Sequence, residues 1–207
     1  MYSCTWSDLK QYCLNKQYDK IDKLLPERRN INFVGWLAEK AIELDDLRLV
    51  EILFKHDPEA VKRKLWSAVS DERTDIVDFL LHHHADATQC LAESCCHKYD
   101  DIFDRILPVF LLQRGDINER DFNNPLFTAC KYGSLSKINK LYLHGVDINV
   151  VDENGRNGLF YCFNQPESLK LLINYGIKMI PDNKGIYPYE LSNSQSCTDI
   201  LRNIDYQ

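Results

Sequence analysis

Asn124-Pro-Leu-Phe-Thr-Ala-Cys-Lys-Tyr-Gly133 opens a pattern that this chain uses more than once. Apolar residues follow it, and His144-Gly-Val-Asp-Ile-Asn149 then closes the unit. Thirty-three residues after Asn124 the same kind of segment begins again with Asn157-Gly-Leu-Phe-Tyr-Cys162, and a third version starts at Asp182-Asn-Lys-Gly-Ile-Tyr-Pro-Tyr-Glu-Leu191. Recurrence at a nearly fixed spacing of this length predicts a protein built from stacked repeats.

These segments resemble the ankyrin repeat, whose pattern runs D-x-x-G-x-T-P-L-H-x-A-A, then V-x-x-L-L, then G-A-D-I/V-N. Asp152-Glu-Asn-Gly155 matches the opening of that pattern, and Pro125-Leu-Phe127 and Gly158-Leu-Phe160 match its P-L-H step. The closing turn is matched by Gly115-Asp-Ile-Asn118 and Gly145-Val-Asp-Ile-Asn149. The resemblance covers roughly residues 113–192 and implies pairs of short helices with projecting β-turn fingers.

The same spacing can be followed backwards through the chain. Each unit needs an apolar or small anchor in its first helix and apolar residues of a second helix about 12 and 15 positions later. The anchors that satisfy this spacing are Leu9, Ala38, Leu65, Leu91, Leu126, Leu159 and Tyr189. We therefore expect an all-α fold, an ankyrin-like helical solenoid of about six to seven helix pairs, because stacking buries apolar stripes that one pair leaves open.

The spacing of the anchors differs between the two halves of the chain. Gaps of 29, 27 and 26 residues separate the first four anchors, whereas the later gaps are 35, 33 and 30 residues. The short gaps leave no room for a finger, so we expect fingers mainly in the C-terminal half. We expect a single solenoid over residues 1–207, with divergent helix pairs over 1–112 and recognisable ankyrin repeats plus a C-terminal cap over 113–207. Pro108 leaves two alternatives for the fourth unit, a longer second helix or a helix broken at the proline.

Composition disfavours several classes of function. The 207 residues carry a formal net charge of −6, with a pI of about 5.5, whereas binding a nucleic-acid backbone needs a basic face. The longest apolar run, Ile106–Leu112, contains a proline and is too short to span a bilayer, so we expect no membrane insertion. No secretion signal is visible in residues 1–8, and we expect a monomeric, cytoplasmic protein with free thiols.

One cluster of histidines and cysteines invites comparison with a metal site. His82-His83-His84 lies near Cys90, Cys95, Cys96 and His97 in the sequence. Structural zinc uses spaced pairs such as C-x-x-C with H-x-x-x-H, which this stretch lacks. We therefore favour a role for the histidines at the C-terminus of a helix, where they interact with its dipole, over a zinc site.

The cysteines give no sign of catalysis. Cys95, Cys130 and Cys162 fall in or beside the slots where the ankyrin pattern has alanine, and Cys serves there as a small hydrophobe. A catalytic thiol needs an electropositive and partly open setting, which nothing in the sequence marks. Phosphate-binding glycine loops and hydrolase motifs are also absent, so we expect no cofactor, no metal and no enzyme activity.

The resemblance implies that a partner sits on the concave face formed by fingertips and first helices. Carried over by position, the fingertip residues are Arg120, Asp121, Phe122, Asn123, Asp152, Glu153, Asn154 and Arg156. The first-helix residues expected to point outward are Thr128, Lys131, Tyr132, Tyr161, Phe163 and Asn164. Exposed aromatic side chains near arginine are typical of binding hot spots, although Phe122 and Phe163 have the alternative of filling the stack.

The resemblance also suggests a modification site. Leu141-Tyr-Leu-His-Gly-Val-Asp-Ile-Asn149 is similar to ankyrin segments whose asparagine is hydroxylated by the animal asparaginyl hydroxylase. Asn149 is therefore a candidate for this modification. Its alternative role is to hold the backbone of the turn in place.

The function implied by the resemblance is a non-catalytic protein–protein interaction module with a protein partner. Divergent ankyrin arrays of this composition occur in pathogen effectors, so we expect an effector in the host cytosol, or its substrate-recruiting ankyrin domain. The alternative is an immunity protein that neutralises a cognate toxin, whose basic charge the acidic chain would complement. An enzyme is the third class, disfavoured because solenoids rarely form deep pockets.

Overall fold

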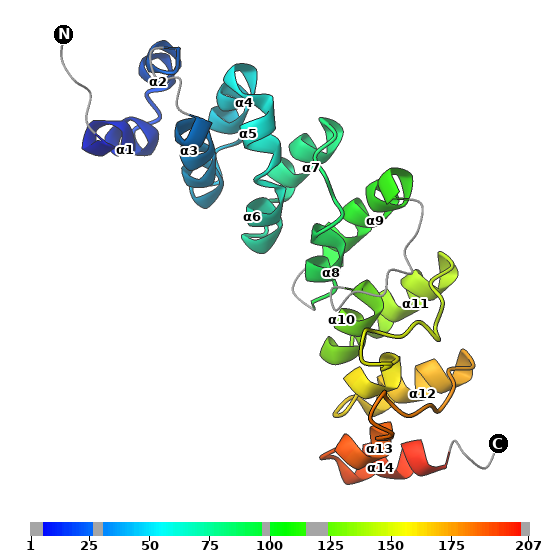
Figure 1. Ribbon diagram of the computed structural model, residues 1–207. Helices are drawn as coiled ribbons and strands as arrows, with labels where there is room; N and C mark the ends of the chain where they lie inside the picture. Colours follow the sequence, from blue (N-terminus) through cyan, green and yellow to red (C-terminus); the bar gives the residue numbers. More distant parts are fainter. Residues whose placement is uncertain (1–5, 27–30, 97–99, 115–123, 204–207) are drawn as a thin grey trace. The chain divides into compact units, whose positions relative to one another are not determined.

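The computed structural model describes residues 6–26, 31–96, 100–114 and 124–203, and these residues contain helices and no strand. They belong to two compact units, Met1–Cys90 and Leu91–Gln207. The predicted all-α fold of successive helix pairs is confirmed (Figure 1). That the pairs form a single solenoid over residues 1–207 stays a prediction.

The described part of the first unit consists of helix pairs that pack on one another. The pairs are α1 (Trp6–Leu14) with α2 (Tyr18–Leu24), α3 (Ile31–Glu43) with α4 (Leu47–His56), and α6 (Leu65–Ser70) with α7 (Thr74–His82). α4 contacts both α2 and α7, and α3 contacts α6. First helices therefore pack on first helices and second on second, as in a stacked repeat.

One helix of the first unit was not predicted. α5 (Pro58–Lys62) fills the connection between α4 and α6. Asp57 begins it by accepting a hydrogen bond from the backbone N–H of Ala60 at 3.0 Å, and Pro58 stands at the first helical position, which needs no N–H donor. Because Ala60 and Val61 are buried, this short helix adds to the core in a unit that lacks a finger there.

The turn between paired helices follows the predicted spacing. A residue with positive φ lies seven positions after each of four anchors: Lys16 (φ 51°), Asp45 (53°), Glu72 (58°) and Gly133 (68°). Only the last of these is the glycine that such a left-handed conformation favours. The N-terminal pairs thus form the same helix hairpin, although they lack the glycine that marks the turn in the later repeat.

The second unit contains the recognisable repeats. Its helices are α8 (Cys90–Ser94), which begins at the unit boundary, α9 (Asp100–Arg114), α10 (Pro125–Tyr132), α11 (Leu135–Leu143), the 3₁₀ helix η2 (Gly158–Tyr161), α12 (Pro166–Asn174), α13 (Pro188–Leu191) and α14 (Gln195–Arg202). α10 packs on η2, α11 on α12, and α12 on α14. α9 continues through Pro108, so the longer helix is the correct one of the two alternatives.

The anchors lie where the spacing places them. Leu9, Ala38, Leu91, Leu126 and Leu159 have no exposed surface, and Leu65 is nearly as buried. The last anchor, Tyr189, is only half-buried, and its ring stacks on that of Tyr187 with centroids 5.4 Å apart. A continuous core runs through each unit, as stacked amphipathic helices require.

Candidate functional site

Two projecting turns of the second unit have the same internal structure. In the first finger, residues 152–156, Asp152 Oδ1 accepts hydrogen bonds from the backbone N–H groups of Asn154 and Arg156, both at 2.8 Å. The backbone N–H of Asp152 donates to the carbonyl of Arg156 at 2.9 Å, which closes the turn. Asp152 is 4% exposed, so its carboxylate is an internal brace of the finger.

The second finger, residues 182–186, repeats this arrangement thirty residues later. Asp182 Oδ1 accepts from the backbone N–H groups of Lys184 at 2.9 Å and Ile186 at 3.1 Å, and the N–H of Asp182 donates to the carbonyl of Ile186. Gly155 and Gly185 occupy the equivalent positions with φ of 76° and 79°. The D-x-x-G spacing is therefore required by the turn itself.

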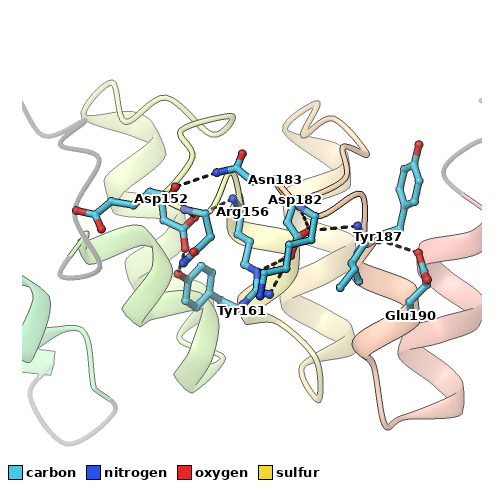
Figure 2. A network of polar contacts seen from close by, with 11 residues as sticks. Asp152, Arg156, Tyr161, Asp182, Asn183, Tyr187 and Glu190 are labelled. Carbon is cyan, nitrogen blue, oxygen red and sulfur yellow. Dashed lines mark hydrogen bonds and ion pairs between the residues drawn. The ribbon is translucent and has the colours of Figure 1, made fainter.

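The two fingers are joined by a polar network (Figure 2). Arg156 donates from Nε and Nη2 to Asp182 Oδ2, at 3.1 and 2.9 Å. Asn183 donates its backbone N–H to the carbonyl of Asn154 at 2.8 Å and its side-chain amide to the carbonyl of Glu153 at 3.0 Å. These bonds tie each finger to the next one and fix their relative position.

Two side chains of this network have shifted pKa values. Burial raises the pKa of Tyr161, and the hydrogen bond that its hydroxyl donates to Asp152 Oδ2 at 2.8 Å raises it further. Burial also acts to raise the pKa of Asp182, but hydrogen bonds from Arg156 and the backbone outweigh it and leave this pKa below its usual range. Both pKa shifts keep the side chain in the protonation state that forms these hydrogen bonds. Tyr161 stays protonated and donates, and Asp182 stays ionised and accepts.

Tyr161 has a second contact within the stack. Its ring stacks on that of Phe127, with centroids 4.6 Å apart and planes 8° from parallel. The tyrosine therefore links η2 to α10 while its hydroxyl supports the first finger. Such an offset aromatic pair contributes to stability beyond the area that it buries.

The candidate residues that the structure describes consequently fall into three groups. Asp152, Arg156 and Tyr161 lie together in the network and contact other parts of the chain. The residues with exposed side chains, called here the exposed set, are Lys131, Tyr132, Glu153, Asn154 and Asn164. Thr128 and Phe163 are half-buried, and Arg120, Asp121, Phe122 and Asn123 lie outside the described residues.

Sequence reasoning did not select three features of the surface. Asp182 and Asn183 form the inter-finger links, and the D-x-x-G spacing shared with Asp152 was a signal that could have found the first of them. Trp66, on α6, is 51% exposed although it follows the buried anchor Leu65. The helical spacing of the buried residues Leu65, Ala68 and Val69 places position 66 outside the core-facing side of α6.

Asn149 holds two segments together. Its Oδ1 accepts the backbone N–H of Lys178 at 2.8 Å, which connects the closing turn of one repeat to that of the next. Its own N–H donates to Asp147 Oδ1 at 2.9 Å. These contacts describe how the turn is held, and hydroxylation of Asn149 stays a prediction.

The run His82-His83-His84 lies at the C-terminus of α7, which ends at His82 and is capped by His83. His84 has a φ of 61° and stands where the later repeats have Gly145 and Gly176, whose φ values are 87° and 80°. The ring of His83 packs at a tilt against those of Phe54 and Phe79, with ring centroids 4.4 and 4.5 Å away. Within the described residues, no three His, Cys, Asp or Glu side chains come together in a way that suits a metal ion.

The three cysteines at or beside the ankyrin alanine positions lie in the core. Cys95, Cys130 and Cys162 have no exposed surface. Burial raises the pKa of the Cys95 thiol, and burial together with a hydrogen bond to Cys130 raises that of Cys162. Raised pKa values leave little thiolate, which is the nucleophilic form.

Comparison with known proteins supports the repeat assignment. Residues 126–177 match the family described as ankyrin repeats (many copies). A search of curated proteins found no match. Among the described residues, no helix has the length and apolar character needed to cross a membrane.

Proposed function

With ankyrin repeats recognised over residues 126–177, we propose that the fingers and first helices of the Leu91–Gln207 unit bind a protein partner. Ankyrin repeats are protein–protein interaction modules and are in general not catalytic. The observation that carries the proposal is the division of the candidate residues. One group braces the fingers internally, while the exposed set stands on the surface next to them.

The network favours binding because it orders the surface in advance. Fingers that are already fixed by Arg156–Asp182 and Asn183 lose little conformational entropy when a partner docks on them. In this proposal Asp152, Arg156 and Tyr161 position the surface. The exposed set supplies the contacts.

Tyr132 is the first residue to test. It is 41% exposed on α10, and Lys131 places its ammonium 5.7 Å from the centre of the tyrosine ring. A tyrosine beside a cation matches the composition of binding hot spots. Tyr142, on α11 of the same repeat, is 39% exposed and provides a control of the same residue type and nearly equal exposure.

The experiment compares Tyr132→Ala with Tyr142→Ala. A partner captured by the wild-type chain from host-cell extract is produced in pure form, and its dissociation constant is measured by calorimetry. Because a hot-spot side chain contributes about 2 kcal/mol or more, Tyr132→Ala should weaken binding by roughly thirtyfold, whereas Tyr142→Ala should leave it unchanged. Equal affinities for both variants, with both folded by circular dichroism, would contradict the proposal.

We further propose that the chain serves as an effector, or as its substrate-recruiting domain, with a host protein as the partner. The divergent repeats and the recruiting role common to such arrays support this reading. It predicts that the captured partner comes from host extract and not from extract of the organism that encodes the chain. Capture from the encoding organism alone would remove this assignment and leave protein binding intact.

An immunity protein is the second candidate, and the net charge of −6 is the observation that favours it. Attraction between an acidic inhibitor and a basic toxin accelerates association and weakens with salt. A toxin gene beside the gene for this chain, together with salt-sensitive inhibition of its product, would support this reading. Absence of inhibition by the purified chain would exclude it for that toxin.

A further inference from the structure

We propose that Asn154 is a site of spontaneous deamidation and isoaspartate formation, and that this reaction opens the first finger. The chain places glycine directly after an asparagine twice in one repeat, at Asn154-Gly155 and at Asn157-Gly158. Asn154 is exposed at the fingertip, whereas Asn157 has no exposed surface. The same dipeptide therefore occurs in two opposite environments within a few residues.

The finger requires the glycine that makes Asn154 vulnerable. Gly155 has a φ of 76°, and a Cβ added there would lie 2.5 Å from Asn183 Oδ1. A side chain at position 155 would therefore clash with the inter-finger link and strain the turn. Without a side chain, the backbone nitrogen of Gly155 is not shielded from the amide that precedes it.

The reaction needs only water. The backbone nitrogen of Gly155 attacks Cγ of Asn154, so that a new N–C bond forms while the Cγ–Nδ2 bond breaks. Nδ2 leaves as ammonia and takes the proton lost by the Gly155 nitrogen. Water then opens the five-membered imide at one of its two carbonyls, which gives aspartate or, with the main chain rerouted through Cγ, isoaspartate.

Hydrogen bonds of the folded finger slow the attack without preventing it. The N–H of Gly155 donates to the carbonyl of Asp152 at 3.0 Å, so the nitrogen reacts from states in which this turn has opened. Exposed loop tips open at a lower free energy than buried segments do. Asn157, in contrast, accepts the N–H of Leu159 at 3.2 Å and donates to the carbonyl of Lys178 at 2.8 Å, which fixes both ends of its amide.

Isoaspartate at position 154 disrupts the backbone contacts of the first finger. Isoaspartate adds a methylene to the main chain between Asp152 and Arg156, whose backbone groups are paired at 2.9 Å. It also displaces the Asn154 carbonyl, which accepts the N–H of Asn183. A new negative charge then stands beside those of Asp152 and Glu153. Thermolabile asparagines of this kind limit the lifetime of a fold.

The test uses the full chain in its native state at mildly alkaline pH. Samples are digested at intervals and each asparagine is followed by mass spectrometry, with isoaspartate identified by an isoaspartyl methyltransferase. Asn154 should convert more than about tenfold faster than Asn157, which corresponds to a difference in opening free energy of only about 1.4 kcal/mol. It should also outpace Asn183, which is exposed but precedes Lys184.

Denaturant and a variant complete the test. In concentrated urea, where both Asn-Gly sites are open, Asn154 and Asn157 should convert at similar rates. The isoaspartate fraction of aged wild type should melt at a lower temperature, and Asn154→Gln should show no such loss on ageing. Conversion of native Asn157 as fast as Asn154, or conversion of Asn154 no faster than that of Asn183, would overturn the proposal.

Discussion

The carboxylate of Asp152 performs three tasks at once. It accepts hydrogen bonds from two backbone N–H groups of its finger and from the hydroxyl of Tyr161. A charged acceptor that serves three part-buried hydrogen bonds is costly to remove, because hydrogen bonds to a charged group are stronger than those between neutral groups. The residue therefore acts on the surface through the finger that it braces.

Replacing Asp152 tests this brace. Asp152→Ala should lower the free energy of unfolding by about 2–3 kcal/mol, since it removes three hydrogen bonds to a charged acceptor, those from Asn154, Arg156 and Tyr161. Urea denaturation followed by circular dichroism measures the change. Glu153→Ala is the control, and its exposed side chain should change stability by less than about 0.5 kcal/mol. Equal effects of both variants would show that the brace contributes nothing.

Asp182 makes the stability depend on pH. Its pKa is lowered in the folded state, so between that value and the ordinary pKa the unfolded chain binds more protons than the folded chain. The contribution of Asp182 is complete above the ordinary pKa of about 3.9 and is lost as the pH falls through the folded-state value. Wild type should therefore lose more stability than Asp182→Asn when the pH is lowered from about 5 to about 2 in urea titrations. Parallel losses would contradict the assignment.

Ser168 differs from Asp152 in its hydrogen bonding. Its Oγ is buried and has no hydrogen-bond partner among the described residues. Removing an unsatisfied buried hydroxyl from a helix relieves a desolvation cost, so Ser168→Ala should raise stability by about 0.5–1 kcal/mol. Ser94→Ala is the comparison, because Ser94 Oγ donates to the carbonyl of Leu91 at 2.7 Å. A melting temperature for Ser168→Ala below that of Ser94→Ala would show that Ser168 is satisfied.

At the scale of elements, the helix hairpin is the unit that the chain repeats. Lys16, Asp45, Glu72 and Gly133 all have positive φ at the turn between paired helices, although their side chains have little in common. The conformation is set by packing of the two helices against their neighbours and not by the preference of the residue. Three of these turns therefore carry the strain that an L-residue has in the left-handed region.

Relieving this strain should stabilise the first unit. Glu72→Gly should raise the free energy of unfolding by about 0.5–1 kcal/mol, because glycine adopts this φ without the Cβ clash and the gain exceeds its added entropy in the unfolded chain. The neighbouring Asp71 has a φ of −90°, so Asp71→Gly should destabilise. Urea titration of both variants measures the difference. Destabilisation by both changes would mean that the turn is not strained at Glu72.

At the scale of the molecule, the two compact units can be observed separately. All three tryptophans, Trp6, Trp36 and Trp66, belong to Met1–Cys90, so their fluorescence reports on that unit alone. In a repeat protein each repeat interacts directly only with its neighbours, and destabilisation need not spread along the chain.

A variant of the second unit tests this independence. Asp152→Ala should shift the urea midpoint of the circular dichroism signal, which reports on both units, more than it shifts the midpoint of tryptophan fluorescence. Glu72→Gly, in the first unit, should move the fluorescence midpoint upward. Identical shifts of both signals in both variants would instead indicate that the two units unfold as one cooperative array.

The helix pairs could be predicted from sequence because their signals are local. Apolar anchors such as Leu65 and Leu126 recur with helical spacing, and each is buried in the structure. The extra helix α5 was not predicted, because it lies between two anchors and the anchor spacing carries no signal for it, although Asp57-Pro58 is a helix-start signal.

The sequence by itself determined the pairing of helices, the positions of the anchors and the presence of ankyrin repeats, because helical periodicity is recorded in neighbouring residues. Only the tertiary structure decided which of the candidate residues have exposed side chains and which lie in the polar network. Asp152, Arg156 and Tyr161 share the sequence features of a binding surface with Tyr132 and Glu153, yet they are engaged by Asp182, Phe127 and each other. The Arg156–Asp182 and Tyr161–Phe127 contacts join residues from successive repeats, and no local pattern in one repeat shows which residues the next repeat places beside it.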